Sequence, residues 1–299
     1  MKFLLLIVAL LENIFIYCQT EAYPVIDMHL HAYTKDQRWT YRVPNPRTNK
    51  PLTADNAQKQ YDSTLWQMKK WNYGKAVISG DTSAVSSWKK LQPNLFIAGL
   101  QIDGTNLPDT NWLKEMFTTK KIEVLGEIEV QYDGIAPDSN IMTPYFALAE
   151  RFDIPVAIHM GPAFPGAVHR GFPKYRTRLS NPLLLENVLA KHPRLRIYVM
   201  HGGWPFQQEM LGLMLAYPQV YFDFAGIGWQ APVEIVHDYL KKFIDAGFGK
   251  RILFGSDQMV WPDAIPIAIE NILQAKFLNE EQKKDILYRN AERFLKIKL

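Results

Sequence analysis

The chain has 299 residues, of which 47% are hydrophobic, 13% aromatic and 21% charged. This composition is typical of a globular protein with enough apolar material for a large core. The formal net charge is only +4 and the basic residues are scattered, which argues against a nucleic-acid partner. The length fits either two domains or one barrel of alternating strands and helices.

Residues 1–22 are typical of a signal peptide. A charged start precedes an apolar run over residues 3–11, which is too short to span a bilayer, and a small-x-small cleavage sequence follows. We therefore expect an exported chain, periplasmic or secreted, with no stable membrane span in its mature part. The only cysteine, Cys18, lies in this segment, where the bulky residues before it argue against a lipid anchor. The alternative is an ordinary buried segment.

From residue 23 onward, short aliphatic runs alternate with longer amphipathic stretches, a pattern that predicts strand-helix units around a parallel sheet. The expected strands are Val25–His31, Lys75–Ser79, Leu95–Ile102, Glu123–Tyr132, Pro155–Met160, Arg196–His201, Val220–Phe224 and Arg251–Asp257. The expected helices are Ala54–Trp71, Thr110–Thr118, Thr143–Arg151, Pro182–Lys191, Trp204–Tyr217, Pro232–Ala246, Ala264–Ala275 and Asn279–Lys296. Eight such strands predict a single (β/α)8 TIM barrel over residues 23–299.

Two long segments interrupt this alternation. Residues 32–53 are rich in Asn, Pro, Arg and Lys, and residues 161–180 contain several glycines and prolines, so both are expected to be loops. Loops of this length in a compact barrel usually cover an active site.

The first expected strand ends in two histidines, His29 and His31. Because side chains alternate along a strand, both imidazoles should face one point, and they could offer two nitrogen ligands to a metal. In a regular strand Asp27 would point with Val25 and His29, and would brace a ligand or the barrel floor. Taken alone, the pair could equally be ordinary core or surface histidines.

Other reactive side chains also fall at strand ends, where barrels of this kind carry their functional groups. Glu127 lies within the fourth expected strand, His159 is the next-to-last residue of the fifth, and the sixth and eighth end in His201 and Asp257. Since the eighth strand neighbours the first in a closed barrel, its carboxylate can reach the histidine pair. Three imidazoles and one carboxylate predict an open catalytic site for Zn²⁺, and Mn²⁺ or Fe²⁺ would also accept these ligands.

Five motifs in this order resemble the amidohydrolase superfamily, in its amidohydrolase-related branch: Asp27-Met28-His29-Leu30-His31, Gly126-Glu127-Ile128, Ile158-His159-Met160-Gly161, Met200-His201-Gly202-Gly203 and Phe254-Gly255-Ser256-Asp257. The resemblance implies that His29, His31, His159 and Asp257 bind metal. It makes His201 a ligand of a second metal or a catalytic group. Binuclear relatives often carry a modified lysine where this chain has Glu127. This glutamate either bridges two ions or orients a ligand histidine, so one ion and two ions are both open.

The resemblance also implies metal-assisted attack of water on the C–N or C–O bond of an amide, cyclic amide or lactone. Asp257 would take the proton of the water and pass it to the leaving group, and His201 would polarise the substrate carbonyl. The second hypothesis is non-oxidative decarboxylation of a small carboxylic acid, such as an aromatic acid, a reaction found in the same branch. A non-catalytic barrel that binds a metal or a sugar is the third.

We expect a small-molecule substrate to be bound by the loops that follow the later strands. The candidates after the fifth strand are His169, Arg170, Tyr175, Arg176 and Arg178. A guanidinium there could clamp a carboxylate, although solvated loop charges would look the same. The aromatic candidates are Trp204, Trp229 and Trp261, which could equally be packing residues. Tyr132 and Gln258 are assigned no role, and a homo-oligomer is open.

Overall fold

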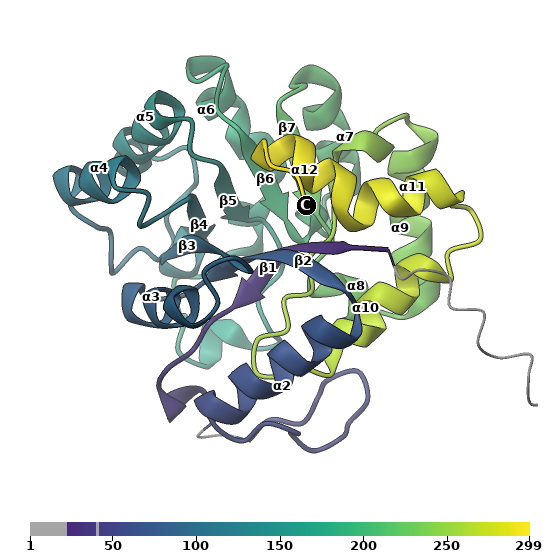
Figure 1. Cartoon of the computed structure of the whole chain (residues 1–299). Coiled ribbons are helices and arrows are strands. Elements are labelled where there is room, and N and C mark those ends of the chain that lie inside the picture. The colour runs from purple at the N-terminus through teal and green to yellow at the C-terminus, as the bar shows by residue number, and fades with distance from the viewer. Residues whose placement is uncertain (1–22, 40–41) are drawn as a thin grey trace, which may run out of the picture.

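The computed structural model describes residues 23–39 and 42–299, so the expected leader and Cys18 lie outside the described residues. Eight parallel strands form one sheet in chain order, and helices surround them (Figure 1). The strands are β1 (Val25–His31), β2 (Tyr73–Ser79), β3 (Phe96–Ile102), β4 (Val124–Ile128), β5 (Val156–His159), β6 (Ile197–Met200), β7 (Val220–Asp223) and β8 (Ile252–Leu253). Within the described ranges, no helix is long and apolar enough to cross a membrane.

Hydrogen bonds between the segment after β8 and β1 bring the ends of the sheet together. The amide of Met28 donates to the carbonyl of Phe254 at 2.8 Å, and the amide of Asp257 donates to the carbonyl of His29 at 2.7 Å. The expected (β/α)8 TIM barrel is therefore confirmed. The same two bonds place the end of β1 beside Asp257.

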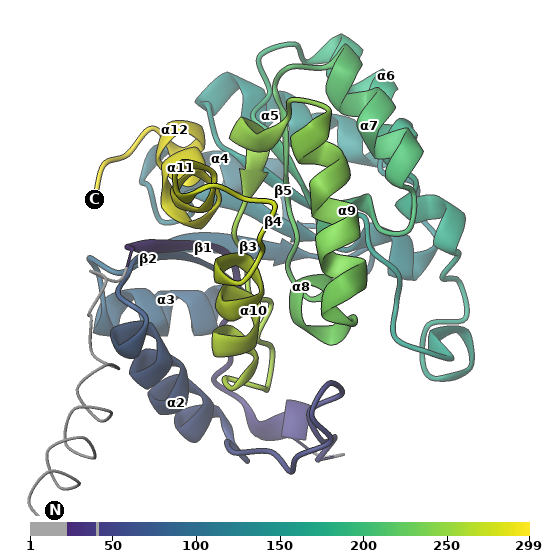
Figure 2. The same ribbon diagram turned by 90° about the vertical axis from the view of Figure 1, so that its right-hand side faces the viewer.

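The helices cover the outside of the barrel. They are α2 (Ala57–Lys70), α3 (Thr82–Leu91), α4 (Thr110–Thr118), α5 (Thr143–Phe152), α6 (Glu186–Lys191), α7 (Gln207–Ala216), α8 (Ile227–Gln230), α9 (Val233–Asp245), α10 (Ala264–Leu273), α11 (Glu280–Lys284) and α12 (Asn290–Leu295). A π-helical turn, Asp285–Arg289, separates α11 from α12 within the expected last helix. Figure 2 shows both helices on the side of the barrel where β1 begins.

Some expected boundaries are wrong. The helix α3 was not expected, because four of its ten residues are Ser or Thr, which are weak helix formers. Its apolar residues Ala84, Val85 and Trp88 nevertheless form one buried face, and the side chain of Asp81 caps the helix by accepting from the amides of Ser83 and Ala84. The fourth strand ends at Ile128, and the expected continuation to Tyr132 is a 3₁₀ turn, η2 (Val130–Asp133), which ends at the left-handed Gly134. The helix expected from Trp204 begins at Gln207.

The barrel interior is apolar towards the starts of the strands. Side chains from all eight strands form one cluster there with α12: Ile26, Met28, Val77, Ile97, Val124, Ala157, Tyr198, Met200, Leu253, Ala291 and Phe294, with Tyr221 partly buried against them. The ring of Phe294 contacts the rings of Tyr198 and Tyr221 and so closes this end. Polar chemistry is thereby left to the opposite end of the barrel.

Candidate metal centre

The carboxyl ends of the strands hold a buried cluster of histidines and carboxylates. It contains all six side chains that the sequence singled out for metal binding, each less than a tenth exposed: His29, His31, Glu127, His159, His201 and Asp257. Subsets of this cluster offer ligand atoms that lie within 4.8 Å of one another. By their distances to the two oxygens of Glu127, the side chains form two groups that share Glu127; His29 and His201, one from each group, also lie in one such subset with it.

The first group lies where β1, β4 and the segment after β8 meet. The Nε2 atoms of His29 and His31 each lie 3.5 Å from Oε2 of Glu127. The same two nitrogens lie 3.6 and 3.0 Å from Oδ1 of Asp257. Two nitrogens and two oxygens therefore face one point.

The second group uses the other oxygen of Glu127. Its Oε1 lies 2.6 Å from Nδ1 of His159 and 3.5 Å from Nε2 of His201. The two nitrogens lie 3.0 Å apart. Each oxygen of Glu127 therefore faces a different pair of imidazoles.

These spacings fit divalent cations. With Zn–N bonds of about 2.0–2.1 Å, two ligand atoms of a tetrahedral zinc lie roughly 3.3 Å apart, and the observed separations of 2.6–3.6 Å bracket this value. The Nε2 atom of His29 is buried without a hydrogen-bond partner, although carboxylate oxygens lie nearby. A cation bound among these atoms would supply the missing interaction.

The tautomer of His201 also suits a ligand. Its Nδ1 lies 3.0 Å from the carbonyl oxygen of Ala225, an atom that can only accept a hydrogen bond. Nδ1 therefore carries the proton, and in the neutral ring Nε2 presents its lone pair towards Glu127. Such a carbonyl partner commonly fixes the orientation of a metal-binding histidine.

Burial and mutual attraction together set the charges in the cluster. Burial alone would raise the pKa of Glu127, but His29, His159 and His201 outweigh it and hold the pKa well below its usual range. Burial likewise raises the pKa of Asp257, and the neighbouring histidines reverse the shift. For His29, burial lowers the pKa and the surrounding carboxylates raise it well above its ordinary value. Both carboxylates are therefore ionised at neutral pH, as cation ligands must be.

Asp27 braces the first group, although β1 is not the regular strand that simple alternation assumed. The register between β1 and β2 shifts twice, once between Val25 and Ile26 and once between Asp27 and Leu30. Oδ1 of Asp27 accepts from the amides of His29 at 2.9 Å and Ser256 at 3.0 Å. The carboxylate thus ties the ligand strand β1 to the segment that carries Asp257.

Gln258 holds His31, a role that the sequence analysis did not assign. Its Oε1 accepts from the amide of His31 and its Nε2 donates to the carbonyl of His31, both at 2.8 Å. The side chain thus pairs with β1 as a strand backbone would, beyond the end of β8. The carbonyl of His31 also accepts from Nε2 of Gln60 at 3.2 Å.

Asp223, at the end of β7, is a site residue that the sequence analysis missed. Its Oδ2 lies 3.3 Å from Nδ1 of His29, within ion-pair distance but without hydrogen-bond alignment. Its Oδ1 accepts from the amides of His201 and Ala225, both at 3.0 Å. One carboxylate therefore positions ligands of both groups. Asp223 ends an apolar strand, as the other candidate ligands do, and this position in the sequence could have identified it as a site residue.

A family model described as amidohydrolase matches residues 26–297. The chain belongs to the amidohydrolase family. The match includes every residue of the two groups, so the resemblance noted from the five motifs is confirmed. Among curated proteins, protein fluG of Emericella nidulans is 23% identical over 115 residues, which are 38% of this chain and 13% of that protein. The matched part is a small fraction of that relative.

Solved structures share the fold of this amidohydrolase. An uncharacterized TIM-barrel protein from Bordetella bronchiseptica has a TM-score of 0.67 at 19% identity, over 91% of this chain and 98% of that one. A probable 2-pyrone-4,6-dicarboxylic acid hydrolase from Acinetobacter baumannii has a TM-score of 0.62 at 16% identity, over 91% of this chain and 99% of that one. The 5-carboxyvanillate decarboxylase from Sphingomonas paucimobilis has a TM-score of 0.62 at 13% identity, over 92% of this chain and all of that one. At these identities the likeness establishes the fold alone.

Gly161 of the amidohydrolase leaves room for His201, and this predicts the effect of one substitution. A Cβ added at Gly161 would lie 2.6 Å from Cδ2 of the His201 ring. We expect Gly161→Ala to displace that ring and to weaken any binding of a divalent cation such as Zn²⁺ by the second group by about 10–100-fold, as measured by competitive chelator titration. Gly212→Ala is the matched control, because nothing lies within 4 Å of its added Cβ. Equal zinc affinity in both variants would show that His201 does not bind the metal.

The loop after β5 uses its basic residues mainly for its own structure. Nη1 of Arg176 donates to the carbonyls of Pro173 at 2.9 Å and Tyr175 at 2.7 Å. The guanidinium of Arg170 lies over the ring of Phe164, 5.5 Å from its centre. His169 and Arg178 are exposed in the 3₁₀ turns of this loop. Their role in substrate binding stays a prediction.

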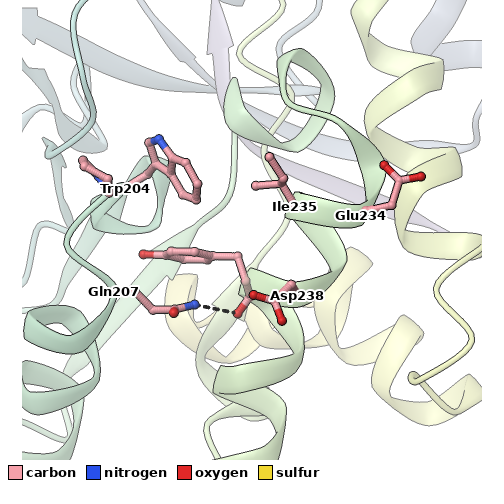
Figure 3. A pocket seen from close by; sticks show the side chains of 7 residues that line it. Trp204, Gln207, Glu234, Ile235 and Asp238 are labelled. Atoms are coloured by element: carbon pink, nitrogen blue, oxygen red, sulfur yellow. Dashed lines mark hydrogen bonds between the residues drawn. The ribbon is translucent and has the colours of Figure 1, made fainter.

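The three tryptophans lie in different surroundings. Trp229 is fully buried and donates to the carbonyl of Ser256 at 2.9 Å, so it is a packing residue. Trp261 donates to the carbonyl of Val43 at 3.0 Å and thereby fastens the long loop after β1. Trp204 lines a surface hollow of about 400 Å³ with Gln207, Glu234, Ile235 and Asp238 (Figure 3). The residues that line this hollow include none of the six candidate metal ligands.

Proposed function

We propose that this amidohydrolase is a hydrolase that uses two divalent cations, most simply Zn²⁺, to cleave a C–N or C–O bond in a small amide, cyclic amide or lactone. The observation that carries the proposal is the position of Glu127, whose two oxygens face two different pairs of imidazoles. A carboxylate in this position can bridge two cations. In the alternative, Glu127 only orients one ligand histidine. That role does not account for its contacts with the other three histidines of the cluster.

The residues of the cluster divide the chemical work. Bound cations would supply Lewis-acid chemistry, which polarises a carbonyl group and makes water more acidic. Asp257 is ionised and its Oδ1 lies in the first group, 3.0 Å from Nε2 of His31, so it takes the proton of the attacking water and passes it to the leaving group. His201 would help to hold the second cation. Both of its ring nitrogens are then engaged, so it does not also polarise the substrate carbonyl.

Hydrolysis is favoured over decarboxylation by the charges near the second group. A carboxylate oxygen of Glu129 lies within 4.8 Å of ligand atoms of Glu127 and His159, and Glu129 also accepts a hydrogen bond from Gln101. A substrate carboxylate near the second group would lie close to the carboxylates of Glu127 and Glu129. Arg176 is the residue expected to bind such a carboxylate, but its Nη1 donates hydrogen bonds to two backbone carbonyls. The bound cations would offset part of this repulsion for an anion, whereas an uncharged acyl group does not meet it.

Metal removal followed by a substrate panel tests the proposal. We expect chelator-treated protein to retain less than about 1% of the rate of protein reloaded with Zn²⁺, since water activation depends on the cation. The panel contains lactones, cyclic amides, N-acyl amines and aromatic acids, with product acids and carbon dioxide both measured. Zinc-dependent hydrolysis supports the proposal. Zinc-dependent release of carbon dioxide from an aromatic acid, without hydrolysis of the other compounds, would replace it with the decarboxylase.

A further inference from the structure

The turn after β4 places a tyrosine beside the candidate metal centre. The 3₁₀ turn η2 begins two residues after β4, the strand that ends with Glu127 and Ile128, and it carries Tyr132. The ring of Tyr132 meets the ring of His159 at 65°, with the ring centres 5.5 Å apart. The phenol therefore borders the second group of ligands.

The ring of Tyr132 is held by two aromatic side chains from the loop after β5. Its centre lies 4.8 Å from that of Phe172 and 5.3 Å from that of Tyr175. The Tyr175 hydroxyl in turn accepts a hydrogen bond from the amide of Ala163 at 2.9 Å, which ties this loop together. Packing of this kind holds the Tyr132 ring in one position before a substrate arrives.

The hydroxyl of Tyr132 is a donor that the protein itself does not use. Within residues 23–39 and 42–299, no side chain or backbone group accepts a hydrogen bond from it. A phenol keeps its proton near neutral pH, so the hydroxyl can act as a hydrogen-bond donor there.

We propose that the Tyr132 hydroxyl donates a hydrogen bond to the carbonyl oxygen of the substrate and to the oxyanion that forms from it. The inference rests on the proposed hydrolysis. Polarisation of the substrate carbonyl was first expected of His201. Its two ring nitrogens face Ala225 and Glu127 instead, so another donor is needed for this role. Tyr132 is thus a catalytic residue contributed by the turn after β4.

The step balances without proton loss from the tyrosine. As the water oxygen bonds to the carbonyl carbon, the π electron pair of the carbonyl moves onto its oxygen and Asp257 takes the proton of the water. The Tyr132 hydroxyl stabilises the negative oxygen and keeps its own proton. When the C–N or C–O bond breaks, the electron pair returns to the carbonyl and the leaving group receives the proton from Asp257.

The test is Tyr132→Phe in the full chain reloaded with Zn²⁺, because this change removes one hydroxyl and keeps the ring. We expect unchanged zinc content and KM, and a kcat lower by about 10²-fold on the best lactone or amide of the panel. Methylphosphonate, a tetrahedral anion, should bind about 10-fold more weakly in calorimetry, since one hydrogen bond to a charged group is lost. Tyr145→Phe is the control, as its hydroxyl donates to the remote carbonyl of Pro108.

The outcomes separate this inference from the proposed function. If the wild type hydrolyses its substrate and Tyr132→Phe matches it in kcat and methylphosphonate affinity, the role of Tyr132 is wrong and the hydrolase stands. Loss of zinc in Tyr132→Phe would also overturn the inference, because it would show a structural role. If the zinc-loaded wild type hydrolyses nothing, the proposed function fails and this inference fails with it.

Discussion

Glu127→Gln is expected to leave the protein folded with at most one bound zinc and to lower kcat by roughly 10³-fold or more. Glutamine keeps the size of the side chain but offers one neutral oxygen where the carboxylate offers two charged ones. Only one of the two groups can then keep an oxygen ligand from this position, and neither keeps the negative charge. Zinc per chain is measured by plasma mass spectrometry, and kcat on the substrate that the panel identifies.

The matched control for this variant is Glu123→Gln. Glu123 directly precedes β4 and pairs with Lys89 at 2.8 Å on the outside of the barrel, far along the strand from the site. Loss of this partly exposed ion pair should change stability by less than about 1 kcal/mol and leave zinc content unchanged. If Glu127→Gln retained two zinc ions with full turnover, the glutamate would not be the bridge.

Asp257→Asn is expected to lower kcat by about 10²–10⁴-fold, with a smaller effect on the second bound zinc. The amide cannot take a proton from water, whereas the oxygens of Glu127 and the histidines of the second group are unchanged. Loss of the negative charge should also weaken zinc binding by His29 and His31. Steady-state kinetics at saturating zinc separate the lost proton transfer from the lost affinity.

Asp245→Asn controls for removal of an aspartate as such, because Asp245 is an exposed residue that pairs with Lys241 at 2.5 Å on α9. Its zinc content and turnover should equal those of the wild type. Turnover of Asp257→Asn within a factor of about 3 of the wild type at saturating zinc would remove Asp257 from the proton-transfer role.

The position of each candidate ligand along the chain was accessible from the sequence for one physical reason. The carboxyl ends of parallel strands share one edge of a barrel, so polar residues that end apolar strands converge there. This placed His159 and His201 beside the histidine pair of β1 without any knowledge of side-chain directions. It also made the closed barrel a strong expectation, which the bonds between β1 and the segment after β8 bear out.

The supporting residues were less accessible, because they depend on contacts between distant segments. Gln258, which follows β8, contacts His31 only once that segment lies beside β1. Asp223, at the end of β7, likewise reaches His29 only in the folded barrel. Tyr132 was hidden because Ile128, Val130 and Tyr132 alternate with polar residues as in a longer strand, whereas the chain turns after Ile128. The two-sided contact of Glu127 depends on its side-chain direction, which no spacing rule supplies.

The most direct measurement is anomalous diffraction at the zinc edge from crystals of the zinc-loaded protein. The account predicts two peaks, one on each side of the Glu127 carboxylate. The first should lie among His29, His31 and Asp257, and the second between His159 and His201. A single peak, with Glu127 bonded only to a ligand histidine, would contradict the bridged pair and establish a one-metal centre.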